Sequence, residues 1–521
     1  MLKQNILIAE PLGKEGLELV QQHANVDVCL KLPVEELKTI LPNYHALIVR
    51  SATQVNDALL DAGKNLIVVG RAGVGVDNID VAAATQRGIT VVNAPTTNIV
   101  AAAEHTVAIL WALARNIPQA DASVRRGEWK REQFSGVELD GKRLGLVGLG
   151  RVGSEVARRA VGLGIQVVAF DPYVSPERAA QMQVKMVSFD EALATSDFVS
   201  LHTPVTKETK KLLGAEEFAK FKKGARLVNA ARGALLDENA LLDALDSGQL
   251  AGAALDVFEQ EPTKNERLLK HPRVVMTPHI GGSTAEAATR VSLEIAEEVL
   301  AVLQARPAKF AVNAPMVSPT LAQVLRPYMD LAERLGRFYT KWVGGPLGKI
   351  QVEYEGKIAG EDTGVLTAAI IKGLLEPIVE TRVNLVNAAM LAQTHGLDIS
   401  ERKTRHAARY ENMLTIVGER RVSGTLLHDD PHIVQLDGNW IDFVPQGYVM
   451  LTRHRDRPGM IGKVGTLLGA ADVNIASMQV ARDGPRGEAI MVLTLDDPVP
   501  NDVMEKIHQE LDIQWSKVLD L

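Results

Sequence analysis

An arginine, a glutamate and a histidine in the middle of the chain have complementary chemistry and similar settings. Arg232, Glu261 and His279 each follow an apolar run typical of a buried strand, at 227–230, 253–257 and 274–276 respectively. Because ligands of an open parallel sheet bind beyond the carboxyl ends of its strands, we expect all three side chains at one edge.

This set of side chains suits hydride transfer at a hydroxyl-bearing carbon. The imidazole of His279 can take a hydroxyl proton as hydride leaves the same carbon. The carboxylate of Glu261 can hold the other ring nitrogen and favour the protonated ring that ketone reduction requires. The guanidinium of Arg232 can bind a substrate carboxylate and polarise a 2-oxo group. Taken alone, each residue is also typical of a structural histidine, a turn carboxylate or a loop-capping arginine.

A glycine-rich unit at residues 143–171 predicts the hydride acceptor. An apolar run is followed by Gly148, Gly150 and Gly153 in G-x-G-x-x-G spacing, by a helical pattern, and by a second apolar run that ends in Asp171. The first glycine permits a tight turn, the second lets the backbone approach a pyrophosphate, and the third lets helix and strand pack closely. Asp171 can accept from ribose hydroxyls and would repel a 2′-phosphate. The unit therefore predicts NAD rather than NADP as the cofactor.

Composition narrows the class of protein. The 521 residues suffice for about three or four domains. The 46% hydrophobic and 23% charged residues are typical of a soluble globular protein, and a net charge of −7 argues against nucleic-acid or membrane-surface partners. Cys29 is the only cysteine, so an intrachain disulfide is excluded, and its apolar setting favours a buried structural thiol. The longest apolar stretch, 101–114, is interrupted by Glu104 and His105, and the N-terminal apolar run is too short for a signal peptide. We expect a cytoplasmic protein and no metal site.

Apolar runs alternate with helical patterns over the first three hundred residues, as in parallel α/β sheets. In the first domain we expect strands at 6–9, 26–29, 46–49, 67–69 and 90–93, and helices at 12–22 and 57–62. One long helix over about 98–127 leads into the nucleotide domain, whose strands lie near Leu144, Val167, Phe198, Leu227, Ala253 and Val274. A helix over about 283–304 leads out of it.

The C-terminal part changes composition twice. Residues 313–320 predict a linker. The next region predicts helices over 321–343 and 364–394 and strands near Met413, Gly424, His432 and Trp440. It has no motif with a chemical role, which favours a structural or assembly domain. From about Gly447, strand and helix patterns at 448–452, 459–470, 474–480, 488–495, 501–511 and 513–517 predict a βαββαβ split sandwich.

Several segments together resemble the D-isomer-specific 2-hydroxyacid dehydrogenase family, and within it the long-form D-3-phosphoglycerate dehydrogenases. They are VRSAT at 49–53, GRAGVGVDNID at 70–80, NAPTTN at 93–98, GLGRVG at 148–153, FDPY at 170–173, VNAARG at 228–233, ALDVFEQEP at 254–262 and PHIGGST at 278–284. The resemblance covers essentially the whole chain. It implies NAD-dependent oxidation of 3-phospho-D-glycerate to 3-phosphohydroxypyruvate, the first step of serine synthesis from that intermediate.

The resemblance also implies a fold. A Rossmann-type nucleotide domain at 99–285 would be inserted in a flavodoxin-like substrate domain formed by 1–98 and 286–316. An α+β intervening domain at 317–445 and a βαββαβ ACT domain at 446–521 would follow.

The family's functional residues map onto this sequence position by position. Its catalytic residues fall on Arg232, Glu261 and His279. Its NAD contacts fall on Val74, Gly148, Gly150, Arg151, Val152, Gly153, Asp171, Thr203, Pro204, Ala230, Ala231, Arg232, Asp256, His279, Ile280, Gly281 and Gly282. Its substrate contacts fall on Arg50, Arg71, Gly73 and Asn98. The two arginines of the substrate set fit a phosphate because a doubly charged group needs cationic donors, although either one alone is also typical of a surface arginine.

The last domain resembles the amino-acid-sensing ACT module through HRDRPGMIGKVGTLL at 454–468 and VNIASM at 473–478. In serine-inhibited relatives, L-serine is held between paired modules by groups that match His454, Asp456 and Asn474. This chain has Asp456 where the best-understood sensors have an amide, and a carboxylate cannot donate. Two interpretations stay open: an L-serine effector site, and a dimerisation module without an effector. Paired surfaces suggest a homotetramer.

Two other functions also stay open. A different D-2-hydroxyacid dehydrogenase, acting on glyoxylate, hydroxypyruvate or lactate, would keep the catalytic residues, but Arg50, Arg71 and the two C-terminal domains count against it. A non-catalytic NAD-sensing scaffold or corepressor would need no turnover, and the intact catalytic set counts against that.

Overall fold

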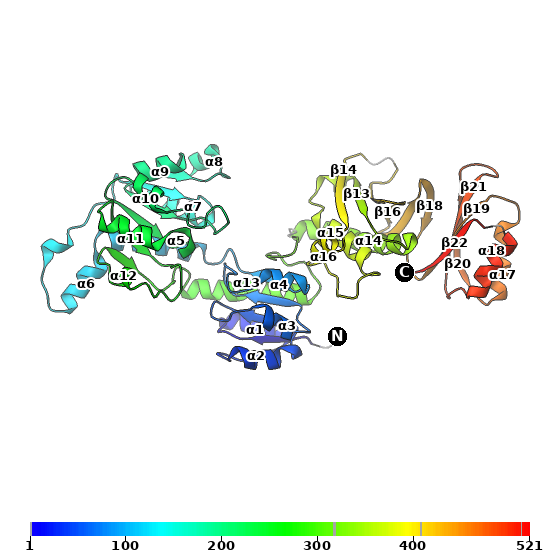
Figure 1. Cartoon of the computed structure of the whole chain (residues 1–521), viewed down its shortest axis with the longest axis horizontal. Coiled ribbons are helices and arrows are strands. Elements are labelled where there is room, and N and C mark those ends of the chain that lie inside the picture. The colour runs from blue at the N-terminus through cyan, green and yellow to red at the C-terminus, as the bar shows by residue number, and fades with distance from the viewer. Residues whose placement is uncertain (1–2, 316–318, 407–408, 512) are drawn as a thin grey trace. The chain divides into compact units, whose positions relative to one another are not determined.

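The computed structural model describes residues 3–315, 319–406, 409–511 and 513–521 (Figure 1). The contacts within the described chain divide it into two compact units. One unit comprises Pro95–Glu294 with Gly13–Glu15, and the other comprises the rest of the described chain. The residues before Pro95 thus form the first sheet, Pro95–Glu294 contain the second, and the chain after Glu294 belongs to the first unit again. The domain boundaries expected from the sequence stay predictions.

The first domain is a five-stranded parallel sheet. Its strand order, β2-β1-β3-β4-β5, is that of flavodoxin-like folds and confirms the expected class. The strands are β1 Asn5–Ile8, β2 Asn25–Val28, β3 Ala46–Val49, β4 Val68–Arg71 and β5 Thr90–Asn93, and the helices are α1 Lys14–His23, α2 Val34–Ile40, α3 Asp57–Ala62 and α4 Val81–Gln86. The central strands are apolar on both faces, as in sheets covered by helices on both sides. Cys29 is only partly buried against this core, contrary to expectation.

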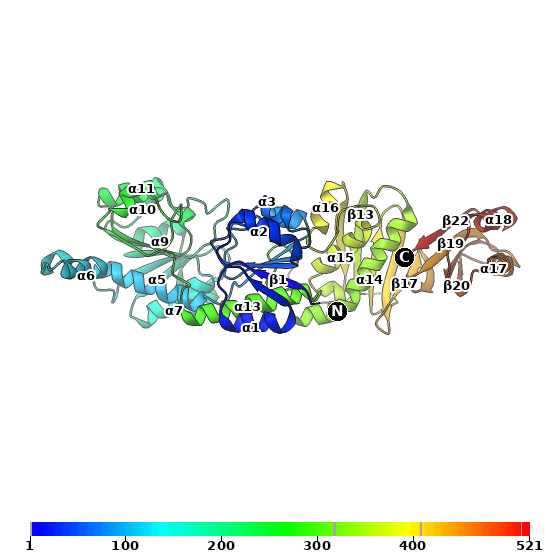
Figure 2. The same cartoon turned by 90° about the horizontal axis from the view of Figure 1, so that it is seen from below.

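The nucleotide domain is a seven-stranded parallel sheet in the order β12-β11-β10-β9-β6-β7-β8. Its strands are β6 Arg143–Val147, β7 Gln166–Phe170, β8 Lys185–Met186, β9 Phe198–Leu201, β10 Ala225–Asn229, β11 Leu250–Leu255 and β12 Val274–Met276. Its helices are α5 Ile99–Ala114, α6 Ile117–Arg125, α7 Arg151–Gly162, α8 Pro176–Gln181, α9 Phe189–Thr195, α10 Ala215–Lys220, α11 Glu238–Asp246 and α12 Glu266–Leu269, before α13 Ala285–Leu303. Helices α5 and α7 pack on one face of the sheet, and helices α10 and α11 pack on the other (Figure 2). The strand order reverses between β6 and β9, where doubly wound sheets bind nucleotides.

The single helix expected over 98–127 is wrong. The chain forms two successive helices, α5 and α6 (Figure 2). Between them Asn116 has a φ of 52°, a left-handed conformation that ends a helix. Pro118 lies in the first turn of α6, where its missing N–H costs nothing.

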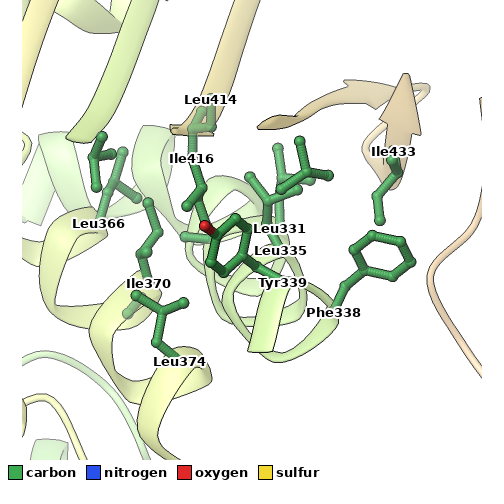
Figure 3. Close-up of a cluster of buried hydrophobic side chains, with 14 of the residues drawn as sticks. Leu331, Leu335, Phe338, Tyr339, Leu366, Ile370, Leu374, Leu414, Ile416 and Ile433 are labelled. Carbon is green, nitrogen blue, oxygen red and sulfur yellow. The ribbon is translucent and has the colours of Figure 1, made fainter. Parts of the chain in front are cut away.

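The intervening domain packs α14 Pro319–Val343, α15 Gly364–Leu375 and α16 Ala388–Thr394 against a mixed sheet. The strands are β13 Lys349–Gly356, β14 Asp398–Thr404, β15 Asn412–Val417, β16 Arg421–Leu427, β17 Asp430–Leu436 and β18 Asn439–Phe443. Figure 3 shows side chains of α14 and α15, among them Leu335, Tyr339 and Ile370, directed at strand residues Leu414 and Ile416. The single helix expected over 364–394 is wrong, because the chain forms two helices, α15 and α16. The expected linker lies partly outside the described residues.

The C-terminal domain has the expected βαββαβ order. Its elements are β19 Tyr448–Arg455, α17 Met460–Ala470, β20 Ile475–Arg482, β21 Glu488–Leu495, α18 Asn501–Leu511 and β22 Trp515–Asp520. The antiparallel sheet has the order β20-β21-β19-β22, and α17 and α18 lie together on one face of it (Figure 1). Across the described part of the chain, no helix combines the length and apolarity needed to cross a bilayer.

Candidate active site

The glycine turn joins β6 to α7 at the point where the strand order reverses. Gly148 has a φ of 100°, and a Cβ there would lie 2.6 Å from the carbonyl oxygen of His202. A Cβ on Gly153 would lie 2.3 Å from the carbonyl oxygen of Gly148. The fold itself therefore requires these two glycines. A Cβ on Gly150 would meet no atom of the described chain within 4 Å. The open space at Gly150 fits the approach of a cofactor pyrophosphate.

Asp171 follows β7 and lies beside this turn. Its Oδ2 accepts from the amide of Leu149 at 2.8 Å, and its Oδ1 accepts from the amide of Tyr173 at 2.9 Å. These bonds fix the carboxylate, and each oxygen keeps a further lone pair for a ribose hydroxyl. Turn and carboxylate together fit NAD.

His279 and Glu261 form a hydrogen-bonded pair at the same edge of the sheet. The distance from His279 Nδ1 to Glu261 Oε2 is 2.6 Å, and both side chains are more than a third exposed. Partial burial alone would raise the pKa of Glu261, but donation from His279 and from the amide of Phe258 holds that pKa below its ordinary value. Because Nδ1 faces the carboxylate, Nε2 is the ring nitrogen that can exchange a proton with a substrate hydroxyl.

Arg232 lies on a neighbouring loop of the same unit. The buried side chain of Asn229 donates to the carbonyl oxygen of Arg232 at 2.9 Å and so shapes this loop. A Cβ on Gly233 would lie 2.0 Å from the carbonyl oxygen of Phe258, whose amide donates to Glu261. The loops of the arginine and the glutamate are thus in direct contact.

Asp256, a predicted NAD contact, lies buried beside the loop that carries His279. Its side chain is 1% exposed. Oδ1 accepts from the amide of Ile280 at 2.9 Å and Oδ2 accepts from the amide of Gly281 at 2.8 Å. Burial alone would raise the pKa of Asp256, but donation from His105, Thr277 and the two amides lowers it. The carboxylate holds the loop that carries His279, and its direct contact with NAD stays a prediction.

The other predicted NAD residues of this unit lie just beyond strand ends. Because the strands are parallel, their carboxyl ends share one edge of the sheet. These residues are Arg151 and Val152 after β6, Thr203 and Pro204 after β9, Ala230 and Ala231 after β10, and Ile280, Gly281 and Gly282 after β12. Asn98, a predicted substrate contact, precedes α5, and its Nδ2 would lie 2.9 Å from a Cβ on Gly282.

Arg50 belongs to the other unit, on a loop that Glu10 holds. Oε1 of Glu10 accepts from the amides of Arg50 and Thr53 at 3.0 and 2.8 Å, and Oε2 accepts from the amide of Ala52 at 3.2 Å. Burial alone would raise the pKa of Glu10, but these three amides lower it. The side chain of Asn78 donates to the carbonyl oxygens of Arg50 and Thr53 at 2.9 and 2.7 Å. The loop is therefore held through both its N–H and its C=O groups.

The remaining predicted residues of that unit, Arg71, Gly73 and Val74, lie at the end of β4 and just after it. The guanidinium of Arg71 folds over Gly73, since a Cβ there would lie 1.5 Å from Arg71 Nη1. The side chain of Asn93 donates to the carbonyl oxygen of Val74. Gly73 thus leaves room for the arginine beside it.

The three candidate effector residues are engaged within the ACT fold. His454 is 1% exposed, and burial lowers its pKa. Asp456 accepts from Arg482 at 2.7 Å, which lowers the pKa of that carboxyl. The side chain of Asn474 donates to Asp496. Their roles stay predictions.

Sequence reasoning missed Glu10 and Asn78, which bond the loop of Arg50, and His105, which contacts Thr277 and Asp256. His105 left a signal, since it interrupts an apolar helix. The sequence signal for Glu10 is weaker, namely a carboxylate just after the first strand.

Comparison with known proteins identifies the family. Residues 107–281 match the NAD binding domain of D-isomer specific 2-hydroxyacid dehydrogenases, residues 324–437 match the D-3-phosphoglycerate dehydrogenase intervening domain, and residues 448–512 match the ACT domain. The chain is 44% identical to the D-3-phosphoglycerate dehydrogenase of Archaeoglobus fulgidus over 511 residues, which cover 96% of this chain and 97% of that relative. The chain belongs to the D-3-phosphoglycerate dehydrogenase family.

Other members and more distant structures agree with this. The family member of Bacillus subtilis is 41% identical over 522 residues, 99% of each chain. A glyoxylate reductase from Paecilomyes thermophila has a TM-score of 0.55 and 30% identity, and the match covers 60% of this chain and 99% of that one. A D-lactate dehydrogenase from Aquifex aeolicus, solved with NAD and lactic acid, has a TM-score of 0.52 and 28% identity, over 58% and 96% of the two chains. The cofactor of this dehydrogenase is NAD.

Proposed function

We propose that this dehydrogenase oxidises 3-phospho-D-glycerate to 3-phosphohydroxypyruvate with NAD, the reaction that begins L-serine synthesis from that intermediate. The observation that carries the proposal is the pair of His279 Nδ1 and Glu261 Oε2, 2.6 Å apart, at the sheet edge that also carries the glycine turn. The substrate is supported by relatives of that name with 41–44% identity over nearly the full chain.

In this proposal His279 is the general base of the oxidation. Its Nε2 takes the proton of the C2 hydroxyl while the hydrogen on C2 departs with its electron pair, and the C2–O bond becomes a carbonyl. NAD, when bound, supplies the ring that accepts the hydride. The ionised carboxylate of Glu261 stabilises the imidazolium that forms. In the reverse direction the same imidazolium returns its proton to the carbonyl oxygen.

The arginines bind the charged ends of the substrate. Arg232 forms a two-pronged contact with the C1 carboxylate and polarises the C2 oxygen. Arg50 and Arg71 bind the phosphate, and Asn98 completes the substrate contacts. Asp171 holds the adenosine ribose of the cofactor.

Steady-state turnover of 3-phosphoglycerate with NAD, followed by NADH absorbance, tests the proposal. His279→Ala should lower kcat by about 10²–10⁴, the usual contribution of general acid–base catalysis, while calorimetry shows that NAD still binds. His23→Ala, which removes an exposed histidine from α1, is the matched control and should leave kcat unchanged.

Other outcomes separate the alternatives. Turnover of D-lactate, glycolate or D-glycerate without turnover of 3-phosphoglycerate would indicate a different 2-hydroxyacid dehydrogenase. NAD binding without turnover of any of these acids would indicate a sensor. Full activity of the His279 variant would remove that residue from the mechanism.

We also infer that L-serine binds the ACT domain near His454, Asp456 and Asn474 and lowers turnover, and that the enzyme is a homotetramer. Inhibition by L-serine that Asn474→Ala abolishes is the expected result. Turnover that is independent of L-serine would leave the ACT domain a role in assembly, which sedimentation of the intact enzyme measures.

A further inference from the structure

The loop after β12 carries His279 in a backbone conformation that needs support. The φ of His279 is 54°, in the left-handed region that residues with a side chain rarely adopt. The ring nevertheless reaches Glu261 at 2.6 Å. A small rotation of this turn would therefore move the imidazole away from its carboxylate and its substrate.

Asp256 supplies most of this support. Its Oδ1 accepts from the hydroxyl of Thr277 at 2.6 Å and from the amide of Ile280 at 2.9 Å, and its Oδ2 accepts from the amide of Gly281 at 2.8 Å. These bonds hold the loop on both sides of His279, the residue with the left-handed conformation. The carboxylate is 1% exposed, so solvent hardly competes for it.

His105, on the second turn of α5, completes this group. Its Nε2 lies 3.0 Å from the Thr277 hydroxyl oxygen and 3.2 Å from Asp256 Oδ1. Thr277 has a single hydroxyl hydrogen, and the 2.6 Å contact commits it to the carboxylate. The hydroxyl oxygen and the carboxylate oxygen can then only accept from the ring. The Nε2 atom of His105 must therefore carry a hydrogen.

We propose that His105 is a positioning residue for the catalytic loop, because one N–H shared between Thr277 and Asp256 holds both and so fixes the turn of His279. The loop packs directly on this helix: a Cβ on Gly281 would lie 3.1 Å from Asp256 Oδ2 and 3.7 Å from His105 Cδ2. The proposal rests on the proposed function in one respect, namely that His279 is the base.

Two substitutions at this position separate the donor from the bulk of the ring. His105→Gln keeps an N–H donor at similar reach, and His105→Leu fills the space without one. Because a misplacement of about 1 Å can cost on the order of 10² in rate, we expect kcat of the Leu variant to fall about 10- to 100-fold. The isotope effect from deuterium at C2 should rise, and KM for NAD should stay within about twofold.

The Gln variant should retain kcat within about threefold of the wild type. The control is Glu104→Gln, at the neighbouring position of α5, which removes an exposed ion pair with Arg159. It should change neither kcat nor the isotope effect.

Hydrogen–deuterium exchange of the intact enzyme measures the protection of amides in the loop that carries His279, and it does not depend on turnover. Peptides that contain the amides of Ile280 and Gly281 should exchange faster in His105→Leu and at the wild-type rate in His105→Gln. If the Leu variant fails to fold, His105→Met, which also lacks an N–H donor at this position, should show the same faster exchange.

Wild-type kcat and wild-type exchange in His105→Leu would overturn the proposal. Equal losses in the Leu and Gln variants, with lowered unfolding temperatures, would also overturn it, because packing rather than the N–H would then be responsible. If the wild type does not turn over 3-phosphoglycerate, the proposed function fails, and the exchange comparison still decides whether His105 holds the loop.

Discussion

Alanine at two glycines of the cofactor turn should lower the stability of the fold to different extents. In Gly153→Ala the new Cβ would lie 2.3 Å from the carbonyl oxygen of Gly148, a contact that only a backbone shift can relieve. Overpacking typically costs about 1–3 kcal/mol, and we expect the upper end, about 3 kcal/mol, because the opposing atom belongs to the backbone. In Gly150→Ala the Cβ meets no described atom within 4 Å, but Gly150 is the N-cap of α7 with a ψ of −157°, a position that disfavours alanine. That substitution should destabilise the fold by only about 0.5–1 kcal/mol.

The effects on cofactor affinity should be reversed. The methyl group added by Gly150→Ala would fill the space through which we expect the pyrophosphate to approach. We expect the Kd for NAD to rise about 10- to 100-fold in this variant, equivalent to about 1.4–2.8 kcal/mol of binding free energy. Gly153→Ala, measured well below its unfolding temperature, should bind NAD more nearly like the wild type.

Thermal unfolding and calorimetric titration with NAD measure both quantities on the same samples. Gly162→Ala is the matched control, because it lies at the far end of the same helix and its Cβ also meets no described atom within 4 Å. It should leave the affinity for NAD unchanged. Wild-type affinity in Gly150→Ala would refute the placement of the pyrophosphate. Wild-type stability in Gly153→Ala would refute the close contact within the turn.

Three further results should follow from the site. Asp171→Asn keeps an acceptor for the Leu149 amide but loses the negative charge. The preference for NAD over NADP, measured as the ratio of the two kcat/KM values, should therefore shrink about tenfold. An unchanged ratio would contradict the role of that carboxylate. Glu10→Gln should raise KM for 3-phosphoglycerate several-fold with KM for NAD unchanged, because it loosens the loop of Arg50, whereas equal changes in both constants would argue against that reason. Burial lowers the pKa of His202 from 6.5 to about 4, so its neutral form stabilises the fold fully above pH 6.5 and this contribution is lost as the pH falls toward 4. Between about pH 7.5 and about pH 5 the wild type should lose roughly 2 kcal/mol of unfolding free energy that His202→Gln keeps. Urea unfolding, followed by a brief protease pulse that cleaves unfolded chains within residues 95–294, measures this difference. Equal losses in the two proteins would contradict it.

The glycine turn and the His279–Glu261 pair could be predicted because their requirements are simple. The turn needs only backbone properties that the spacing of glycines determines. The pair needs only that two parallel strands end at the same edge, since each side chain follows its strand by a few residues. Neither inference required knowledge of side-chain packing.

The errors in the helices have local causes that the sequence also contained. The apolar pattern of α5 continues into α6, which hid the left-handed Asn116, although Pro118 indicated a helix start two residues later. The run after α15 contains Pro377, which cannot continue a helix. Strand β14 was missed because nearly all of its residues are polar or exposed, so it has no alternation to detect.

The environment of Asp256 could not be predicted, because its partners come from distant segments. An ionised carboxylate has about four sites for hydrogen-bond donors. His105 and Thr277 direct two donors at it, and the amides of Ile280 and Gly281 provide two more. Three of these donors, from His105, Thr277 and Ile280, meet Oδ1, whereas Oδ2 accepts from Gly281 and keeps a further lone pair for a ligand. The bonds from Thr277, Ile280 and Gly281 show that the carboxylate holds the loop that carries His279, and its direct contact with NAD stays a prediction.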